Sequence, residues 1–198
     1  LLAQYLVGLH PLDQGSYGGP EGLNAQQQAN RFNAYRAQNY KKGRAVIQAM
    51  YDVQVANHGK NTRESAAALV LLGDWNLWQG QRETAMAAYQ QAVTELVAAG
   101  TAQQDIDALF AEPVALPNIR GARALPPAVE PADNTLQVAF TVNETGKISD
   151  MERVDENDVS NGLVNRVMRT LRKTQFRPQL AMGEPVVTEN VTRAYVID

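Results

Sequence analysis

The placement of proline constrains this chain more than any other feature. The sequence has no proline from residue 21 to residue 112, five between residues 113 and 131, and then only Pro178 and Pro185. A proline inside a helix costs roughly 3 kcal/mol. The proline-free stretch, which is rich in Ala and Gln, is therefore predicted to be helical. The proline cluster is predicted to be an extended linker or a strapping loop.

Glycines and capping residues divide the proline-free stretch into predicted helices. Breaks are expected at Gly43, Gly59, Gly80 and Gly100, because glycine readily adopts the left-handed conformation that ends helices. Thr62 is predicted to cap the helix after Gly59. Thr101 and Gln104 fit a capping box that opens a short helix before the prolines. Helices joined by such tight turns are expected to pack as antiparallel hairpins.

Small residues recur at matching positions of two predicted hairpins. When the second hairpin is aligned on the first, Gly73 falls on Ala37 and Ala85 falls on Ala49. Small residues are needed where the two helices of a hairpin approach closely, and the spacing is near the tetratricopeptide period of about 34 residues. The second copy resembles that family at these positions: Leu72, Gly73, Gly80, Ala85, Tyr89 and Ala92.

The resemblance to tetratricopeptide repeats has one departure and one implication. Asn76 stands where an aromatic residue is usual, and the first copy is degenerate, so a plain helical bundle stays the alternative. In tetratricopeptide arrays the first helix of each hairpin lines a concave binding face. The resemblance therefore makes Asp74, Leu77 and Trp78 candidate partner contacts, although a tryptophan here also fits the core of a repeat.

From Thr135 onward the periodicity changes from helical to alternating. Leu136, Val138, Phe140 and Val142 alternate with more polar residues, which predicts a strand with one buried face. A hairpin turn at 143–146, a bulged strand at 147–154 and a helix to about residue 174 follow. A last strand is predicted at 186–197, and its buried face is expected to consist of Val187, Val191, Tyr195 and Ile197. The order is strand, strand, helix, strand.

This C-terminal third resembles the C-terminal domain of TonB-type energy transducers. The matching segments are Val138–Val142, Gly146–Ile148, Phe176–Pro178 and Gly183–Val186. The tyrosine-proline pair that often opens that domain is missing, and the proline-rich spacer is short. The resemblance implies a small β-β-α-β fold and a periplasmic setting. It also implies capture of an extended receptor segment at an edge strand, which makes these residues candidate contacts: Val187, Thr188, Glu189, Asn190 and Val191.

Together these patterns predict an α+β chain with two modules. We expect a helical-repeat module at 1–112, a proline-rich linker at 113–132 and a TonB-like domain at 133–198. The edge strand of the last domain is expected either to accept a peptide or to be covered by the linker or by a second copy of the chain.

Residues that would carry catalysis are scarce. The chain has no cysteine and only two histidines, His10 and His58, which lie in different segments. No nucleophile-elbow motif or phosphate loop is present, and the acidic run at 150–158 lacks the glycine and closing glutamate of a calcium loop. We therefore predict a protein that is not an enzyme, with no metal or cofactor site. The formal net charge of −3 gives no bias toward nucleic acid.

The predicted function is that of a periplasmic adaptor that binds a protein or an extended peptide, such as an outer-membrane receptor segment. The alternative is an assembly protein that forms a homodimer through its C-terminal edge strand. The chain begins at Leu1 and not at a methionine, so upstream residues are expected to have been removed. Any export signal or membrane anchor would lie among them, and membrane contact is expected only through such an anchor.

Overall fold

The computed structural model describes residues 25–116, 125–133, 135–156 and 160–196. It divides into two compact units, a helical one that ends at Ala99 and an α+β one that begins at Gly100. The predicted α+β layout with two modules is confirmed. The division differs from the expected boundary after residue 112, so a short helix and the proline-rich segment belong to the second unit.

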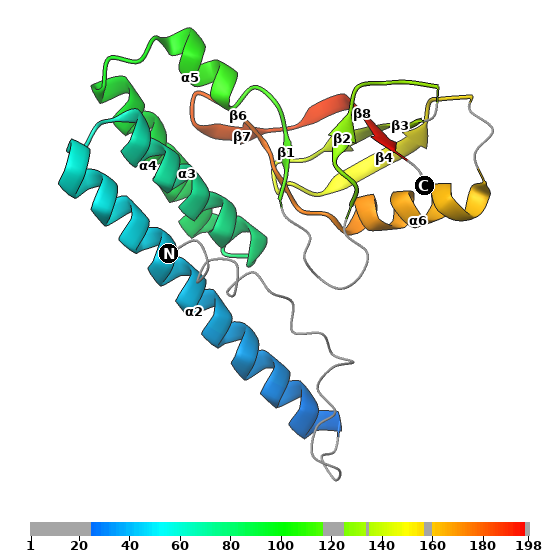
Figure 1. Ribbon diagram of the computed structural model, residues 1–198, viewed down its shortest axis with the longest axis horizontal. Helices are drawn as coiled ribbons and strands as arrows, with labels where there is room; N and C mark the ends of the chain where they lie inside the picture. The colour runs from blue at the N-terminus through cyan, green and yellow to red at the C-terminus, as the bar shows by residue number, and fades with distance from the viewer. Residues whose placement is uncertain (1–24, 117–124, 134, 157–159, 197–198) are drawn as a thin grey trace. The chain divides into compact units, whose positions relative to one another are not determined.

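The helical unit contains three described helices, drawn in blue to green in Figure 1: α2 (Ala25–His58), α3 (Arg63–Trp78) and α4 (Arg82–Ala98). Thr62 caps α3 as predicted, in a reciprocal capping box with Ser65. Gly59, Gly80 and Gly100 have positive φ angles just beyond the three helix ends. These turns confirm three of the four predicted breaks.

The predicted break at Gly43 is wrong, because α2 continues through it. A Cβ atom at Gly43 would lie 2.1 Å from the Trp75 ring, and one at Gly73 would lie 2.3 Å from the Tyr89 ring. These two glycines therefore allow α2 and α4 to approach α3 closely. Glycine costs only about 1 kcal/mol inside a helix, so packing outweighs its weak helix propensity.

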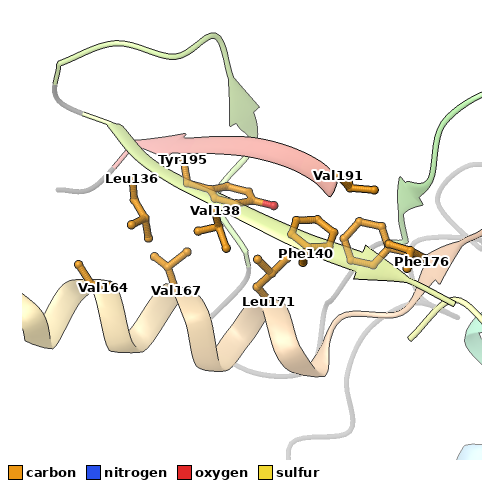
Figure 2. Close-up of a cluster of buried hydrophobic side chains, with 10 residues drawn as sticks. Leu136, Val138, Phe140, Val164, Val167, Leu171, Phe176, Val191 and Tyr195 are labelled. Atoms are coloured by element: carbon orange, nitrogen blue, oxygen red, sulfur yellow. The ribbon is translucent and has the colours of Figure 1, made fainter. Parts of the chain in front are cut away.

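The α+β unit is built on a four-stranded sheet whose strand order is β2-β8-β3-β4. Its strands are antiparallel: β2 (Ala128–Val129), β3 (Thr135–Val142), β4 (Ile148–Arg153) and β8 (Thr188–Val196). Helix α6 (Asn161–Lys173) covers one face. Figure 2 shows side chains of β3, β8 and α6 meeting in one apolar core, with Phe140 and Phe176 in tilted contact at 5.5 Å between ring centroids.

The long elements of this unit agree with the sequence. The strand at 135–142, the hairpin with Gly146 at positive φ, the bulged second strand and the helix ending near residue 174 are all present. The predicted last strand is shorter, because β8 begins at Thr188 and Val187 is exposed. The residues before it form a separate hairpin of β6 (Gln179–Ala181) and β7 (Glu184–Val186).

The proline-rich segment, expected to be either a linker or a strapping loop, contributes to the fold of the second unit. Its two ends form β1 (Val114–Ala115), which pairs with β5 (Phe176–Arg177), and β2, which pairs with β8. Helix α5 (Gln103–Leu109) precedes it, and the Phe110 carbonyl after α5 accepts a hydrogen bond from the Leu180 amide. The predicted cap of α5 by Thr101 is wrong, because Ala102 holds the N-cap position without a side-chain hydrogen bond.

Candidate peptide-binding groove beside strand β8

A groove of about 400 Å³ lies within the α+β unit, beside β8. Its walls are residues 112–116, here called the strap, and residues 125–128, which lead into β2. Thr174, Phe176, Arg193 and Tyr195 complete the lining. A space of this size lies at the small end of ligand sites and fits a few side chains.

The strap is held to the rest of the unit by main-chain pairing. Val114 pairs with Arg177 and Ala115 with Phe176, and the Leu116 amide donates to the Gln175 carbonyl at 2.8 Å. Leu116 is itself buried. These contacts explain why a proline-rich segment forms one wall of the groove: proline has no amide that needs a partner, and the Leu116 amide finds one directly before β5.

The inner surface of the groove is apolar. Phe176 and Tyr195 also belong to the core of the unit (Figure 2), and each is 2% exposed or less. Burial raises the pKa of the Tyr195 phenol to about 12, although the nearby Arg193 charge works in the opposite direction. A phenol with the ordinary value of 10.0 is already neutral at physiological pH, so the groove interior carries no charge from Tyr195 in either case.

Arg193 supplies a positive charge on the groove lining. Its guanidinium donates through Nη1 to the Thr192 carbonyl at 2.9 Å and through Nη2 to the Pro113 carbonyl at 3.3 Å. Nη2 also lies 3.0 Å from the Glu112 carboxylate. The Arg193 side chain is 26% exposed and that of Glu112 is 75% exposed. The pair therefore lies at the surface, where ion pairs contribute at most about 1 kcal/mol.

Strand β8, beside the groove, has a strand partner along the whole of one side but along only part of the other, among the described strands. Strand β3 pairs with it from Thr188 to Val196, whereas among the described strands β2 pairs with it only at Ala194 and Tyr195. A bulge interrupts the ladder, since Glu189 and Asn190 together stand opposite Thr141 and Asn190 has a φ of 55°. The regular stretch with one strand partner is therefore short, at residues 191–193.

The structure separates the edge-strand residues predicted from the sequence. Val187 is exposed before β8, and the Thr188 hydroxyl donates to the Gln179 side chain at 3.0 Å. Glu189 and Asn190 form the bulge. Val191 is buried in the core, so its side chain is not available to a partner strand.

The candidate residues of the helical unit contribute largely to packing. Asp74 accepts a hydrogen bond from the Tyr89 hydroxyl at 2.7 Å, and Leu77 is only 4% exposed. Leu77 is therefore a core residue and not a surface contact, which corrects that prediction. Trp78 is half-buried and contacts Trp75 with ring centroids 5.5 Å apart.

Sequence reasoning did not identify Glu112 or Arg193, and it left the proline-rich segment as either a linker or a strapping loop. A proline-rich segment between two domains suggests a linker, and its pairing depends on β5 and β8, which lie far away in the sequence. The sequence signal for the two short strands consisted of two apolar dipeptides, Val114-Ala115 and Ala128-Val129. Two residues are too few to show a strand period.

Other kinds of site are not found in the part of the chain that the structure describes. No three His, Asp or Glu side chains there are grouped closely enough to hold a metal ion. His58 is the exposed last residue of α2, and His10 lies outside the described residues. Among the described helices, none combines the length and the apolar character needed to cross a bilayer.

Comparisons with protein-family models, curated proteins and solved structures found no match to this chain. The resemblances to tetratricopeptide repeats and to the TonB C-terminal domain therefore rest on the sequence segments that carry them.

Proposed function

We propose that this chain is a non-enzymatic adaptor of the bacterial envelope that binds an extended segment of a partner protein in the groove beside β8. The observation that carries this proposal is the coincidence of an apolar groove with a stretch of β8 that, among the described strands, has a partner on one side only. An extended segment can use both features at once, through main-chain pairing and through a side chain placed in the groove.

The length of the one-sided stretch limits the main-chain contribution. Only residues 191–193 offer a regular edge between the bulge and the part of β8 that β2 covers. Few main-chain hydrogen bonds fit there, so the side chain in the groove has to supply much of the affinity and the specificity. We expect dissociation constants in the micromolar range, as for a small interface.

The proposed setting is the periplasm, and the proposed partner is a segment of an outer-membrane receptor. Both follow from the resemblance of the C-terminal third to TonB-type domains, whose segments Phe176–Pro178 and Gly183–Val186 lie in β5 and in the β6–β7 hairpin here. The helical unit is proposed to provide a second contact surface, for which the half-buried Trp78 is the remaining candidate.

Self-association through an edge strand is the alternative, and the sheet supports it less. Strand β4 is the other edge, and it is also bulged, with Asp150 at a φ of 50°. Bulges and charged residues on edge strands oppose edge-to-edge pairing of sheets. Sedimentation across a wide concentration range tests this alternative directly, and we expect a monomer.

The test of the proposed function is peptide binding with the groove open or filled. Fluorescence anisotropy would measure the affinity of labelled segments from outer-membrane receptors. Ala115→Phe places a ring in the groove from an exposed position, whereas Ala181→Phe makes the same change at an exposed position of β6 that does not line the groove. We expect binding that only Ala115→Phe abolishes. Absence of saturable binding to the unaltered chain would refute the proposal.

A further inference from the structure

We propose that Glu112 is an internal stand-in for a carboxylate of the partner, and that the groove selects segments in which an acidic residue lies close to an apolar one. This inference rests on the proposed function and specifies the chemistry of the partner. It is carried by the contact of Arg193 with Glu112 and by the apolar lining next to it.

The guanidinium of Arg193 is oriented by the main chain. Two carbonyls, those of Thr192 and Pro113, accept hydrogen bonds from its Nη atoms. The side chain is thus ordered before a partner arrives, with part of its surface still in contact with solvent. An arginine that is already ordered loses little conformational entropy when it pairs with a carboxylate.

Glu112 is suited to being displaced. Its side chain is 75% exposed, and its carboxylate accepts a hydrogen bond from the Arg193 guanidinium. Exposed pairs of this kind contribute little to stability. A partner carboxylate can therefore replace Glu112 at small cost, and the charge of Arg193 stays paired before and after the exchange.

The rest of the groove favours an apolar side chain. Phe176, Tyr195, Leu125 and the prolines of both walls line it, and these side chains carry no charge. Arg193 and Tyr195 are two residues apart on β8, so both lie on the same face of the sheet. An acidic residue that meets Arg193 and an apolar residue that enters the groove are therefore expected on the same face of the partner segment.

The experiment begins with a phage-displayed library of random heptapeptides selected on the full chain. One selected peptide is then synthesised in its acidic form and with the acidic residue changed to its amide. Anisotropy gives the affinity of both peptides for the unaltered chain, for Arg193→Gln and for Glu112→Gln. Arg172→Gln on the exposed face of α6 and Glu144→Gln in the exposed hairpin turn are the matched controls.

The two groove variants are expected to act in opposite directions. Arg193→Gln should weaken the acidic peptide about tenfold and remove its advantage over the amide form, because a charge-assisted hydrogen bond is lost. Glu112→Gln should strengthen the acidic peptide roughly 2- to 5-fold, because the internal competitor is gone. The control variants should change neither affinity.

Three results would overturn the inference, and they separate it from the proposed function. The first is a peptide whose binding is abolished by Ala115→Phe but whose affinity is unchanged by Arg193→Gln and by Glu112→Gln. It would refute the role of Glu112 as a stand-in, while the groove would remain a peptide site. Weaker binding by Glu112→Gln would show that Glu112 itself holds the partner. Failure to select any peptide with saturable binding would refute the inference together with the proposed function.

Discussion

At the scale of single residues, Gly146 connects the β3–β4 hairpin to the inner surface of the groove. It has a φ of 73° in the turn, where the Asn143 side chain accepts hydrogen bonds from the amides of Thr145 and Lys147 at 2.9 and 3.0 Å. The Gly146 carbonyl also accepts from the Phe176 amide at 2.8 Å. The turn thus fixes the backbone of Phe176, whose side chain lines the groove.

Gly146→Ala is predicted to destabilise the α+β unit by about 3 kcal/mol. A Cβ atom there would lie 1.8 Å from the Phe176 carbonyl oxygen, so backbone has to move, and the left-handed conformation adds about 1 kcal/mol for a residue with a side chain. Gly80→Ala is the control, since its φ is 81° but no atom lies within 4 Å of the added Cβ. Urea unfolding followed by circular dichroism gives both losses. Equal losses would contradict the role of the close contact.

At the scale of elements, a buried carboxylate joins the three helices of the helical unit. Glu95 on α4 is 4% exposed and accepts hydrogen bonds from the Ser65 hydroxyl of α3 and from the Tyr51 hydroxyl of α2, the latter at 2.6 Å. Gln91 donates to it at 3.3 Å. Burial opposes ionisation, but these hydrogen bonds outweigh it and lower the pKa of Glu95 below its ordinary value of 4.5.

The lowered pKa predicts how the stability of the helical unit depends on pH. The folded carboxylate binds a proton less readily than the unfolded one, so its contribution to stability is fully present above the unfolded value near 4.5 and is lost as the pH falls through the lower folded value. Glu95→Gln should lower the free energy of unfolding by about 2 kcal/mol at pH 7, because the NH2 group that replaces one carboxylate oxygen would face a hydroxyl donor of Ser65 or Tyr51. The difference from the unaltered chain should shrink toward pH 3.

Urea unfolding of both proteins from pH 7 to pH 3 measures this difference. Glu83→Gln, on the exposed first turn of α4, is the matched control and should show no comparable trend. If the difference in free energy of unfolding between the two proteins stays constant across this range, the site requires the shape of the side chain and not its charge.

The lengths of the elements explain which parts of the fold can be predicted from the sequence. Strand β3 and helix α6 have enough residues for their apolar period to show, and the turns at Gly59, Gly80 and Gly146 have glycine where the backbone needs a positive φ. Strands β1, β2 and β5 have two residues each and exist only because distant partners pair with them. Gly43 looked like a helix end because its contact with Trp75 is not visible in the sequence.

The candidate site is predicted less well than the fold for the same reason. The sequence placed the binding edge at 187–191, but the bulge at Glu189 and Asn190 and the burial of Val191 shift the regular edge to 191–193. Arg193 and Glu112 are 81 residues apart in the chain, and no local pattern connects them. Site geometry that depends on tertiary pairing has to come from the structure.

At the scale of the whole molecule, the boundary between the units decides which fragment folds. The sequence suggested a boundary after residue 112, whereas the structure divides at Gly100. The residues in between bring two side chains into the second unit, Ile106 and Phe110, each 2% exposed. The Phe110 ring also lies under the Arg177 guanidinium at 5.7 Å, and its carbonyl accepts from Leu180.

A fragment of residues 100–198 is therefore predicted to unfold cooperatively, and one of residues 113–198 to be less stable by about 3 to 5 kcal/mol. The shorter fragment loses the burial of Ile106 and Phe110 and leaves the Leu180 amide without the Phe110 carbonyl. Urea unfolding with circular dichroism compares the two. Phe110→Ala in the longer fragment should account for most of the loss, whereas Leu109→Ala at the exposed neighbouring position should not. Equal stability of the two fragments would place the boundary after residue 112, because α5 would then contribute nothing to the fold of this unit.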